Sequence, residues 1–480
     1  MITSTRNEKV AAALRLKKRA LRERERQFLV EGAQAVGEAL THPDGLTRLY
    51  HTDPGHPLVE RARSVGAELV HVGDDVMGKL TSTVTPQGLV GVSPFVDVGL
   101  GSVASSAGCV ALLSSVRDPG NAGTVLRSAD AAGADGVVFS SDSVDVYNPK
   151  AVRASAGSLF HLPIVRDVEI PDAIAQLREG GRRIFAMDAS GDADLFELDL
   201  ADPAAFVFGN EAWGLPREVS KLADATVRVP IVGRAESLNL AAAASVCLFE
   251  WTRQQREGRR AVLETVIAAA AHDIRSPLTA MKGFGHALVN RWDQMPEEQR
   301  ALMLAGIVYD TDRLNSILRQ LVDAARLAAG SLDLFPERIE VGRIVGQVAE
   351  SLGRDPDHPE ILWGGGDVQA FVDPERLRLV LEAFIEALVW WTNEGPLRVE
   401  GAVREGRLVL EISRRGTTLS QEDAERLFLA RAPGTGSGSK IGLFVAHGVA
   451  TAQGGTTSVS VGDDVTFVLD VPAEPPDRSG

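Results

Sequence analysis

Apolar positions change their spacing along the chain, and these changes divide it into stretches with different predicted structure. Residues 8–40 carry apolar side chains among charges at helical spacing and predict helices. Short apolar runs then predict the strands of a small α/β domain that ends near Val98, and they cover 47–51, 68–72 and 88–95. The Gly/Ser/Ala-rich stretch 99–108 predicts a linker.

From Cys109 onward, apolar runs of strand length alternate with helical stretches. The runs cover 110–113, 136–139, 183–187, 206–208 and 226–229. Buried strands that alternate with helices predict a mostly parallel sheet with helices on both faces. Open α/β sheets of this kind bind their ligands in the loops at the carboxyl ends of the strands.

After Leu238 the spacing becomes helical for a long way. The helical stretch contains one glycine, Gly258, and no proline before Pro277. A second long helix is predicted from Glu297 to Ala329. Residues 335–475 return to a mixed α/β pattern and end in a predicted strand over 465–471.

Composition excludes several classes of protein. Hydrophobic residues are 44% and charged residues 24% of the chain, which is typical of globular domains and not of disordered or collagen-like chains. We find no apolar run of membrane length and no secretory signal at the start, and therefore expect a cytoplasmic protein without a membrane span. Cys109 and Cys247 cannot form a disulfide framework, and no Cys/His cluster has zinc spacing, so no metal is expected.

The charge of the chain is unevenly distributed. The net charge is −15, yet residues 1–26 hold nine basic and three acidic side chains, which gives this arm +6. A local basic stripe is sufficient to bind a phosphate backbone. A solvated helix face is the simpler interpretation of such a run. The candidate RNA contacts here are Arg6, Lys9, Lys17, Lys18 and Arg19.

Three polar, glycine-containing loops follow predicted strands. The first, 114–136, has a turn at Asp118–Asn121, a glycine at 123 and Arg127 one helical turn further on. The others are 206–216 and 229–245. Alone, the first loop would be a plain strand-to-helix turn, and Ser237 in the third could be a simple helix cap. No GxGxxG follows a strand, so a Rossmann dinucleotide site is not indicated.

Together and in this order, the three loops resemble the motifs of the SpoU-type 2′-O-ribose RNA methyltransferases of the SPOUT superfamily. The resemblance covers about residues 1–257, since the basic N-terminus is similar to the substrate-binding domain of that family. It implies an α/β fold with a trefoil-knotted methyltransferase domain, which is a rare exception to unknotted topology. It also implies a homodimer, S-adenosylmethionine as the cofactor, and RNA as the substrate, more often ribosomal than transfer RNA.

The resemblance also implies roles for individual residues. Arg127 would take the proton from a ribose hydroxyl, with Asn121, Glu211, Ser237 and Asn239 completing the catalytic group. Because a free guanidinium keeps its proton, neighbours must alter its proton affinity. Arg153, in the similar segment 150–164, joins the candidate RNA contacts. The residues implied to hold the cofactor are Phe208, Gly209, Asn210, Gly214, Ile231, Gly233 and Leu238.

A second resemblance begins after residue 258. Residues 271–285 are similar to the phosphoacceptor helix of sensor histidine kinases, with His272 as the possible phosphoacceptor. Residues 310–332 are similar to the second helix of that hairpin. Its apolar residues suit the core of a four-helix dimer; they are Leu314, Ile317, Leu321 and Leu327.

The remaining stretch resembles the ATP-binding domain of these kinases but departs from it at the nucleotide. Glu386 stands where an asparagine helps to hold magnesium, and Arg414 where an aspartate reads the adenine. Thr418 and Lys440 each replace a glycine, although Gly442 is kept. A missing adenine acceptor leaves a donor unpaired, which costs about 1–3 kcal/mol. ATP binding is therefore doubtful, and a regulatory or dimerisation module is the better hypothesis.

Four domains are expected. They are an RNA substrate-binding domain (1–98), a SpoU-type methyltransferase domain (107–257), a helical hairpin (259–332) and a degenerate α+β ATP-binding domain (336–475). The leading hypothesis is an S-adenosylmethionine-dependent RNA 2′-O-methyltransferase. The alternatives are an active histidine kinase with an RNA-binding sensor half and a non-catalytic RNA-binding factor. A response regulator is a conceivable partner, but no residue indicates one.

Overall fold

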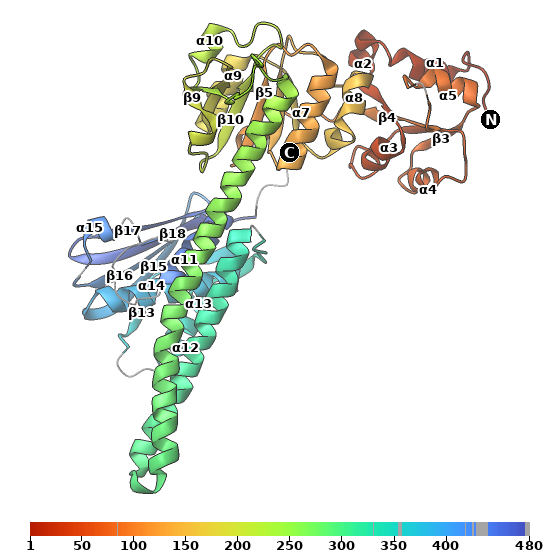
Figure 1. Ribbon diagram of the computed structural model, residues 1–480. Coiled ribbons are helices and arrows are strands. Elements are labelled where there is room, and N and C mark those ends of the chain that lie inside the picture. Colours follow the sequence, from red (N-terminus) through yellow and green to blue (C-terminus); the bar gives the residue numbers. More distant parts are fainter. Residues whose placement is uncertain are drawn as a thin grey trace. The chain divides into compact units, whose positions relative to one another are not determined.

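The computed structural model describes residues 1–83, 85–329, 331–353, 358–417, 419–424, 427–428 and 440–475. The chain forms two compact units, Met1–Arg256 and Glu257–Gly480, which are drawn in Figure 1. Within the described residues, we find no helix that is both long enough and apolar enough to span a membrane.

The first unit begins with a four-stranded mixed sheet in the order β1-β4-β2-β3. Its strands are β1 (Gln27–Glu31), β2 (Arg48–His51), β3 (Glu68–His71) and β4 (Leu89–Pro94). Its helices are α1 (Glu8–Arg15), α2 (Arg19–Glu25), α3 (Ala33–Ala39), α4 (Pro57–Ser64) and α5 (Asp74–Leu80). The three strands expected from the apolar runs are therefore present.

The prediction of helix throughout 8–40 is wrong for Gln27–Glu31, which forms β1 and pairs antiparallel with β4. Phe28, Leu29 and Val30 are buried one after another, a pattern that fits a strand buried on both faces better than one stripe of a helix. Arg26 has a left-handed φ of 51° and ends the preceding helix, so the chain is free to become a strand.

A seven-stranded parallel sheet follows, in the order β7-β6-β5-β10-β8-β11-β9. Its strands are β5 (Cys109–Leu113), β6 (Gly136–Ser140), β7 (Ile164–Val168), β8 (Arg183–Met187), β9 (Ala193–Asp194), β10 (Ala204–Phe208) and β11 (Ala225–Arg228). Its helices and 3-10 turns are α6 (Leu100–Ala104), α7 (Pro119–Ala132), α8 (Pro149–Ser155), η1 (Ser158–Phe160), α9 (Ile170–Glu179), η2 (Leu195–Glu197) and α10 (Arg217–Ser220). The strand order reverses between β5 and β10, where open α/β sheets bind ligands.

This sheet is covered on both faces, as its uninterrupted apolar strands predicted. Along β5, Ala111 and Leu113 belong to one apolar core, and Val110 and Leu112 to another. The first core continues into the N-terminal sheet through side chains such as Phe28. The predicted α/β class is confirmed. The stretch 99–108 is not a free linker, because it contains α6, whose Val103 is fully buried.

Charged side chains join the N-terminal sheet to the parallel sheet. Arg22 of α2 is 2% exposed and donates from Nε to Asp145 Oδ2 at 3.0 Å and from Nη1 to the Leu16 carbonyl at 2.8 Å. Arg166 of β7 forms a two-pronged pair with Glu23, with both N–O distances at 2.8 Å. These contacts fix the N-terminal sheet in place within the first unit.

His161 makes a further bridge, and its effect should depend on pH. Its Nδ1 lies 3.0 Å from Asp130 Oδ2 and its Nε2 lies 3.1 Å from Glu38 Oε2. The bond with Asp130, helped by that with Glu38, outweighs burial and raises the pKa of His161. The stabilisation should be complete below the unfolded pKa of about 6.5 and disappear as pH rises through the raised value.

The measurement is the melting temperature of the full chain against His161→Gln. We expect the wild type to melt higher at about pH 6 and the difference to shrink by about pH 8, as the imidazole loses its charge. The effect should be small, because the ring is partly exposed to solvent. A difference that stays constant over this range would show that the charge of His161 contributes nothing.

The second unit starts with a helical hairpin. Helix α11 (Leu240–Arg291) contains Pro277, and after the 3-10 turn η3 (Trp292–Gln294) comes α12 (Glu297–Ala329), with the bounds expected from the sequence. The rest is a two-stranded sheet, β12-β14, and a five-stranded sheet, β13-β15-β16-β18-β17. The strands are β12 (Glu337–Glu340), β13 (Ile361–Trp363), β14 (Gln369–Val372), β15 (Glu394–Arg404), β16 (Arg407–Arg415), β17 (Thr456–Val461) and β18 (Asp464–Pro472). The helices are α13 (Val341–Leu352), α14 (Pro374–Trp391), α15 (Gln421–Ala424) and α16 (Lys440–Ala452).

The apolar residues of α12 expected in a dimer core are partly used within the chain itself. Leu321 and Leu327 pack against the core of the second unit. A Cβ at Gly448 of α16 would lie 2.6 Å from Leu327 Cδ1, which shows how closely α12 and α16 approach. These two leucines therefore have partners within the chain, and their place in a dimer core stays a prediction. Helical periodicity identified the buried face correctly but not the surface that covers it.

Candidate active site

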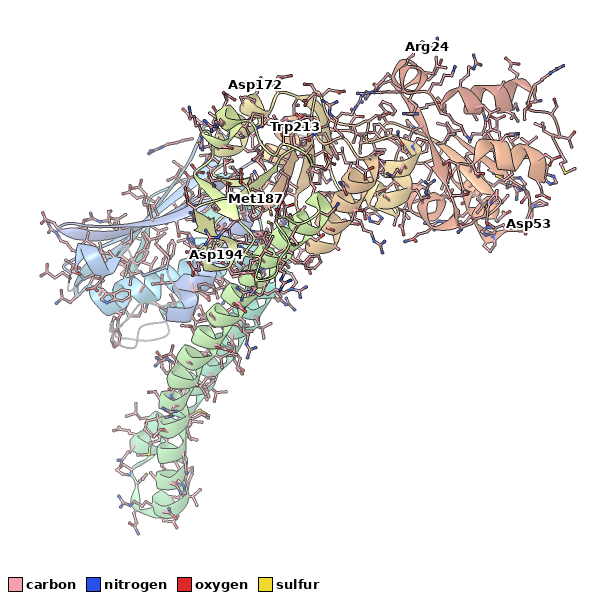
Figure 2. All side chains as sticks on the ribbon, turned by 45° about the horizontal axis from the view of Figure 1, so that its top comes forward. Arg24, Asp53, Asp172, Met187, Asp194 and Trp213 are labelled. Carbon is pink, nitrogen blue, oxygen red and sulfur yellow. The ribbon has the colours of Figure 1, made fainter. Side chains whose placement is uncertain are left out.

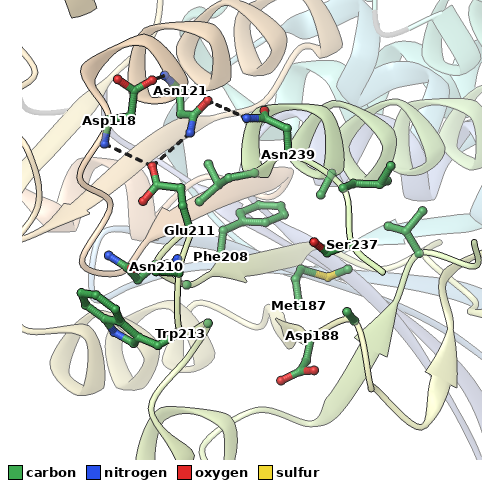
Figure 3. Close-up of a pocket in the computed structure, with 18 of the residues that line it drawn as sticks. Asp118, Asn121, Met187, Asp188, Phe208, Asn210, Glu211, Trp213, Ser237 and Asn239 are labelled. Atoms are coloured by element: carbon green, nitrogen blue, oxygen red, sulfur yellow. Dashed lines mark hydrogen bonds between the residues drawn. The ribbon is translucent and has the colours of Figure 1, made fainter. Parts of the chain in front are cut away.

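A cavity of about 850 Å³ opens at the carboxyl ends of β5, β8, β10 and β11 in the first unit (Figure 3). It lies where the strand order of the parallel sheet reverses. Met187, at the end of β8, and Trp213, from one of the surrounding loops, are marked in Figure 2. The lining residues are Arg117, Asp118, Asn121, Met187–Ala189, Phe208–Gly214, Val227, Val229, Ile231, Ser237–Leu240 and Ala243.

Glu211 ties the second loop to the first. Its carboxylate accepts hydrogen bonds from Asn121 Nδ2 at 3.0 Å and from the backbone N–H groups of Arg117 at 3.2 Å and Asp118 at 3.1 Å. Burial alone would raise the pKa of Glu211, but the hydrogen bonds from Asn121 and the backbone outweigh it and lower the pKa. The cavity therefore contains an ionised carboxylate at neutral pH.

Asn239 ties the third loop to the first. Its Nδ2 donates to Asn121 Oδ1 at 3.1 Å, and its Oδ1 accepts from the backbone N–H of Ala241 at 2.9 Å (Figure 3). Asn239 therefore caps α11, a role that the sequence left open for Ser237. With Glu211, these contacts form one chain of hydrogen bonds, Asn239–Asn121–Glu211, across all three loops.

The second loop is a tight turn with little freedom. Asn210 and Gly214 exchange two backbone hydrogen bonds, each 3.0 Å long, and Gly214 has a φ of +72°. Asn210, which is 5% exposed, also donates from Nδ2 to the Ser115 carbonyl at 2.7 Å. A Cβ at Gly209 would lie 2.2 Å from the backbone carbon of Gly214. The turn can therefore close only with glycine at 209.

We expect Gly209→Ala to open this turn. A methyl group that meets backbone cannot be accommodated by a side-chain movement, so the first unit should lose about 1–3 kcal/mol of stability. Binding of S-adenosylmethionine, measured by calorimetry, should weaken at least tenfold. The matched control is Gly233→Ala, because nothing lies within 4 Å of a Cβ there. Equal binding by both variants would contradict a structural need for Gly209.

The structure brings most of the expected residues together. Of the residues expected to hold the cofactor, all but Gly233 line the cavity. Of the expected catalytic residues, all but Arg127 line it. Arg127 is exposed on α7, outside the lining, and makes no ion pair or hydrogen bond with another described residue. Gly123 permits a close backbone approach between α7 and α8, since a Cβ there would lie 2.3 Å from the Ala151 carbonyl oxygen.

Several lining residues were not predicted. Met187 is the last residue of β8 and Asp188 follows it, and Arg117 and Trp213 belong to loops that were already singled out. The signal for Asp188 was available, because it is the first polar residue after a predicted strand. The carboxylate accepts from the backbone N–H and the hydroxyl of Ser190 at 2.8 and 2.7 Å.

The candidate RNA contacts fall into two groups. Arg6, Lys18 and Arg19 are exposed. Lys17, by contrast, donates to the carbonyls of Lys79 at 2.6 Å and Thr81 at 2.8 Å, and its burial lowers the pKa of its ammonium group. The remaining two also have partners within the chain: Lys9 pairs with Glu68, and Arg153 donates to Ser82 Oγ at 3.0 Å. Lys17 therefore has partners within the chain at the end of α5, and its contact with RNA stays a prediction.

In the kinase-like half, two substituted positions are engaged with the protein itself. Burial, reinforced by Glu382, raises the pKa of Glu386 on α14 to about 7. Arg414 of β16 donates to the carbonyls of Thr392 at 2.8 Å and Gly395 at 3.0 Å. Glu386 does not offer the neutral amide that the kinase pattern has at its position. Arg414 does not offer the carboxylate acceptor that the pattern has at its own.

Three other positions fall partly or wholly outside the described residues. The backbone of His272 lies in α11 and that of Lys440 begins α16, but their side chains are outside the described part. Thr418 is outside it altogether.

The cavity suits a small organic cofactor that is partly apolar and partly charged. Phe208, Ile231 and Leu240 offer apolar surface, and the backbone groups of the tight turn offer hydrogen bonds. The carboxylates of Glu211 and Asp188 favour a ligand with positive charge and hydroxyl groups. These features, beside a domain with a basic arm, define an enzyme that binds such a cofactor and acts on a nucleic acid.

Comparison with known proteins gives the family. Residues 108–249 match the SpoU rRNA Methylase family, residues 7–91 the MRM3-like substrate binding domain, and residues 262–330 the His Kinase A (phospho-acceptor) domain. The 23S rRNA (guanosine(2553)-2'-O)-methyltransferase RlmP of Bacillus subtilis is 32% identical over 248 residues, which are 52% of this chain and 97% of that protein. The chain therefore belongs to the SpoU rRNA methylase family.

Two further proteins are similar to parts of this chain. The 23S rRNA (uridine(2479)-2'-O)-methyltransferase of Streptomyces viridochromogenes is 44% identical over 148 residues, 30% of this chain and 52% of that protein. A crystal structure of an AdoMet-bound rRNA methyltransferase from Sinorhizobium meliloti is 33% identical, with a TM-score of 0.49, over 52% of this chain and 97% of that one. AdoMet is S-adenosylmethionine. The resemblances to SpoU methyltransferases and to histidine kinases are both confirmed.

Proposed function

We propose that the protein transfers a methyl group from S-adenosylmethionine to a ribose 2′-hydroxyl of ribosomal RNA. The observation that carries this is the chain of hydrogen bonds Asn239–Asn121–Glu211, which holds three loops around one cavity. The ribosomal substrate is supported by the relatives, two of which are named as 23S rRNA 2′-O-methyltransferases.

Each part of the cavity has a proposed task. S-adenosylmethionine supplies an electrophilic methyl group on a sulfonium. Phe208, Ile231 and Leu238 give its apolar parts a dry surface, and the backbone of Gly209–Gly214 offers hydrogen bonds. Asn121 and Asn239 are held rigidly by each other and orient the ribose, because a well-aligned pair of reactants removes much of the barrier. Ser237 lines the same wall.

We propose that the protein acts as a homodimer. Exposed positions, four of six apolar, follow one another along α12 at alternating steps of four and three residues, the spacing of a coiled-coil seam. The stripe comprises Leu304, Val308, Leu318 and Val322, with Thr311 and Asn315 between them. In the first unit, Val232 and Phe249 are also exposed apolar side chains. A second copy would cover these surfaces.

The dimer also gives Arg127 a role. Its guanidinium is exposed and has no partner among the described residues of its own chain. We propose that it reaches the cavity of the second copy, where phosphate and carboxylate neighbours adjust its proton affinity as it takes the ribose proton.

The basic arm is proposed to hold the RNA, with Arg6, Lys18 and Arg19 as phosphate contacts. Arg24, at the outer edge of the first unit in Figure 2, pairs only with its neighbour Glu25 and is exposed as well. Cys109 and Cys247 are buried free thiols, which supports a cytoplasmic, reducing location.

For the second unit we propose a regulatory or dimerisation module, with domain limits of 259–332 and 336–475. Glu386 and Arg414 support this role, because they place a carboxyl and a guanidinium where a nucleotide and its magnesium would need an amide and a carboxylate. Labelled ATP should therefore leave no phosphate on His272. Transfer of phosphate to His272 would favour the histidine kinase instead.

The proposed activity has a direct test. Full-length protein is incubated with tritiated S-adenosylmethionine and unmodified ribosomal or transfer RNA, and methylated positions are mapped by resistance to alkaline cleavage. We expect label in ribosomal RNA at a 2′-O position. Label in a base, or in transfer RNA alone, would contradict the substrate. No label, with cofactor bound, would favour a non-catalytic RNA-binding factor.

A further inference from the structure

One aromatic side chain at the mouth of the cavity has no part in the steps proposed above. Trp213 lines the cavity, yet 65% of its surface is exposed. Figure 3 shows its indole at one edge, beside Asn210, with Ser237 and Asp188 towards the other edge. Among the described residues, the indole makes no hydrogen bond and no ring contact. An exposed indole in the lining of a cavity offers a flat apolar surface on which a planar ligand can stack.

The turn that carries Trp213 is rigid. Asn210 and Gly214 close it with two backbone hydrogen bonds, and the Asn210 carboxamide is bonded to the Ser115 carbonyl. On the other side, Glu211 is held by the backbone of Arg117 and Asp118. The indole therefore extends from a fixed base, so a planar partner finds its stacking surface already formed.

A cation lies on the neighbouring loop. Arg117 lines the same cavity and is exposed, and its backbone N–H donates to Glu211 Oε2 at 3.2 Å. Glu211 is only two residues from Trp213, so this bond joins the loop of Arg117 to the loop of Trp213 at the cavity. The guanidinium of Arg117 has no hydrogen bond or ion pair among the described residues.

An aromatic face and a guanidinium that line the same cavity match the chemistry of a single-stranded nucleotide. The base can stack on the indole, and the phosphate can bind the guanidinium. We propose that Trp213 and Arg117 form a nucleotide-binding rim, on which a nucleobase of the RNA substrate stacks and orients its ribose toward the cavity. This inference rests on the proposed function and adds two positioning residues to it.

The test compares Trp213→Ala, Trp213→Phe and Arg117→Ala in the full chain. Stacking on one base corresponds to about a fivefold to hundredfold change in affinity. Trp213→Ala should raise KM for ribosomal RNA about tenfold or more, with kcat and the Kd for S-adenosylmethionine nearly unchanged. Trp213→Phe should restore most of the loss. Arg117→Ala should reduce the slope of log affinity for RNA against log salt concentration by about 1, the value expected for the loss of one phosphate contact. Phe196→Ala is the matched control, since Phe196 is 53% exposed but lies outside the cavity lining.

A second readout does not depend on turnover. A short single-stranded RNA of mixed sequence should quench tryptophan fluorescence of the wild type, and most of this quenching should be absent in Trp213→Phe. If the wild type methylates no RNA, the proposed function fails. The quenching experiment would still show whether RNA binds at the rim formed by Trp213 and Arg117.

Three results would overturn the inference. The first is an unchanged KM for RNA in Trp213→Ala. The second is a loss of cofactor affinity in this variant equal to its loss of RNA affinity, which would mean that the indole covers the cofactor. The third is dissociation of a dimer in this variant, which would mean that the indole contacts a second copy.

Discussion

Replacing Arg127 with alanine is expected to lower kcat of methyl transfer by about 10²–10⁴-fold, the usual contribution of a positioned general base. The Kd for S-adenosylmethionine should not change, because Arg127 lies outside the lining of the cavity. Folding should not change either, since the side chain is exposed and makes no bond to another described residue. Arg61→Ala, another exposed arginine, is the matched control and should retain full activity.

A mixing experiment tests which copy receives Arg127. Arg127→Ala and Asn121→Ala should each be inactive alone. If Arg127 completes the cavity of the second copy, a mixed dimer contains one cavity with both residues, and activity should return to about a quarter of the wild-type level in a random mixture of the two variants. No recovery would place Arg127 and Asn121 in the same active site. Full activity of Arg127→Ala alone would remove it from the mechanism.

Arg22→Ala is expected to destabilise the first unit by about 3–5 kcal/mol, because it leaves Asp145 as a buried charge without its partner. Both side chains are almost fully buried. Calorimetry of the full chain can measure this, and the transition of the first unit is identified by its upward shift with S-adenosylmethionine.

Arg24→Ala is the matched control for this variant. Arg24 lies on the same helix, is exposed and pairs with Glu25, so its loss should cost no more than about 1 kcal/mol. The double variant Arg22→Met with Asp145→Leu should be closer to the wild type than Arg22→Ala, because no unpaired charge remains. Equal destabilisation by Arg22→Ala and Arg24→Ala would show that burial of the pair has no energetic consequence.

The parallel sheet was largely predictable because its inner strands are uninterrupted apolar runs. Strand β10 is buried along its whole length and is visible in the sequence, whereas β7 is buried only at Ile164 and Val165 and β9 has two residues. Edge strands such as these have too few buried apolar residues to be recognised from the sequence. The cavity followed from the sheet, because loops that end parallel strands meet at one edge.

Contacts between residues that are distant in the sequence could not be predicted. Lys17 is one of several similar cations in the basic arm, and only the folded chain brings the carbonyls of Lys79 and Thr81 to it. The stripe with Leu321 and Leu327 has the right spacing for a core, but spacing does not distinguish a domain of the same chain from a second copy. Asn121 and Glu211 were found because loop motifs are local.

The carboxamide of Asn121 accepts a hydrogen bond from Asn239 through its Oδ1 and donates one to Glu211 through its Nδ2. The two hydrogen bonds therefore run in one direction, from the start of α11 to the turn at Glu211. An aspartate at position 121 would place a negative oxygen against the carboxylate of Glu211. A leucine there would leave Glu211 and Asn239 each without this hydrogen bond. A single side chain therefore links three pieces of the chain that lie far apart in the sequence, and the backbone contacts of Glu211 hold two of these pieces together as well.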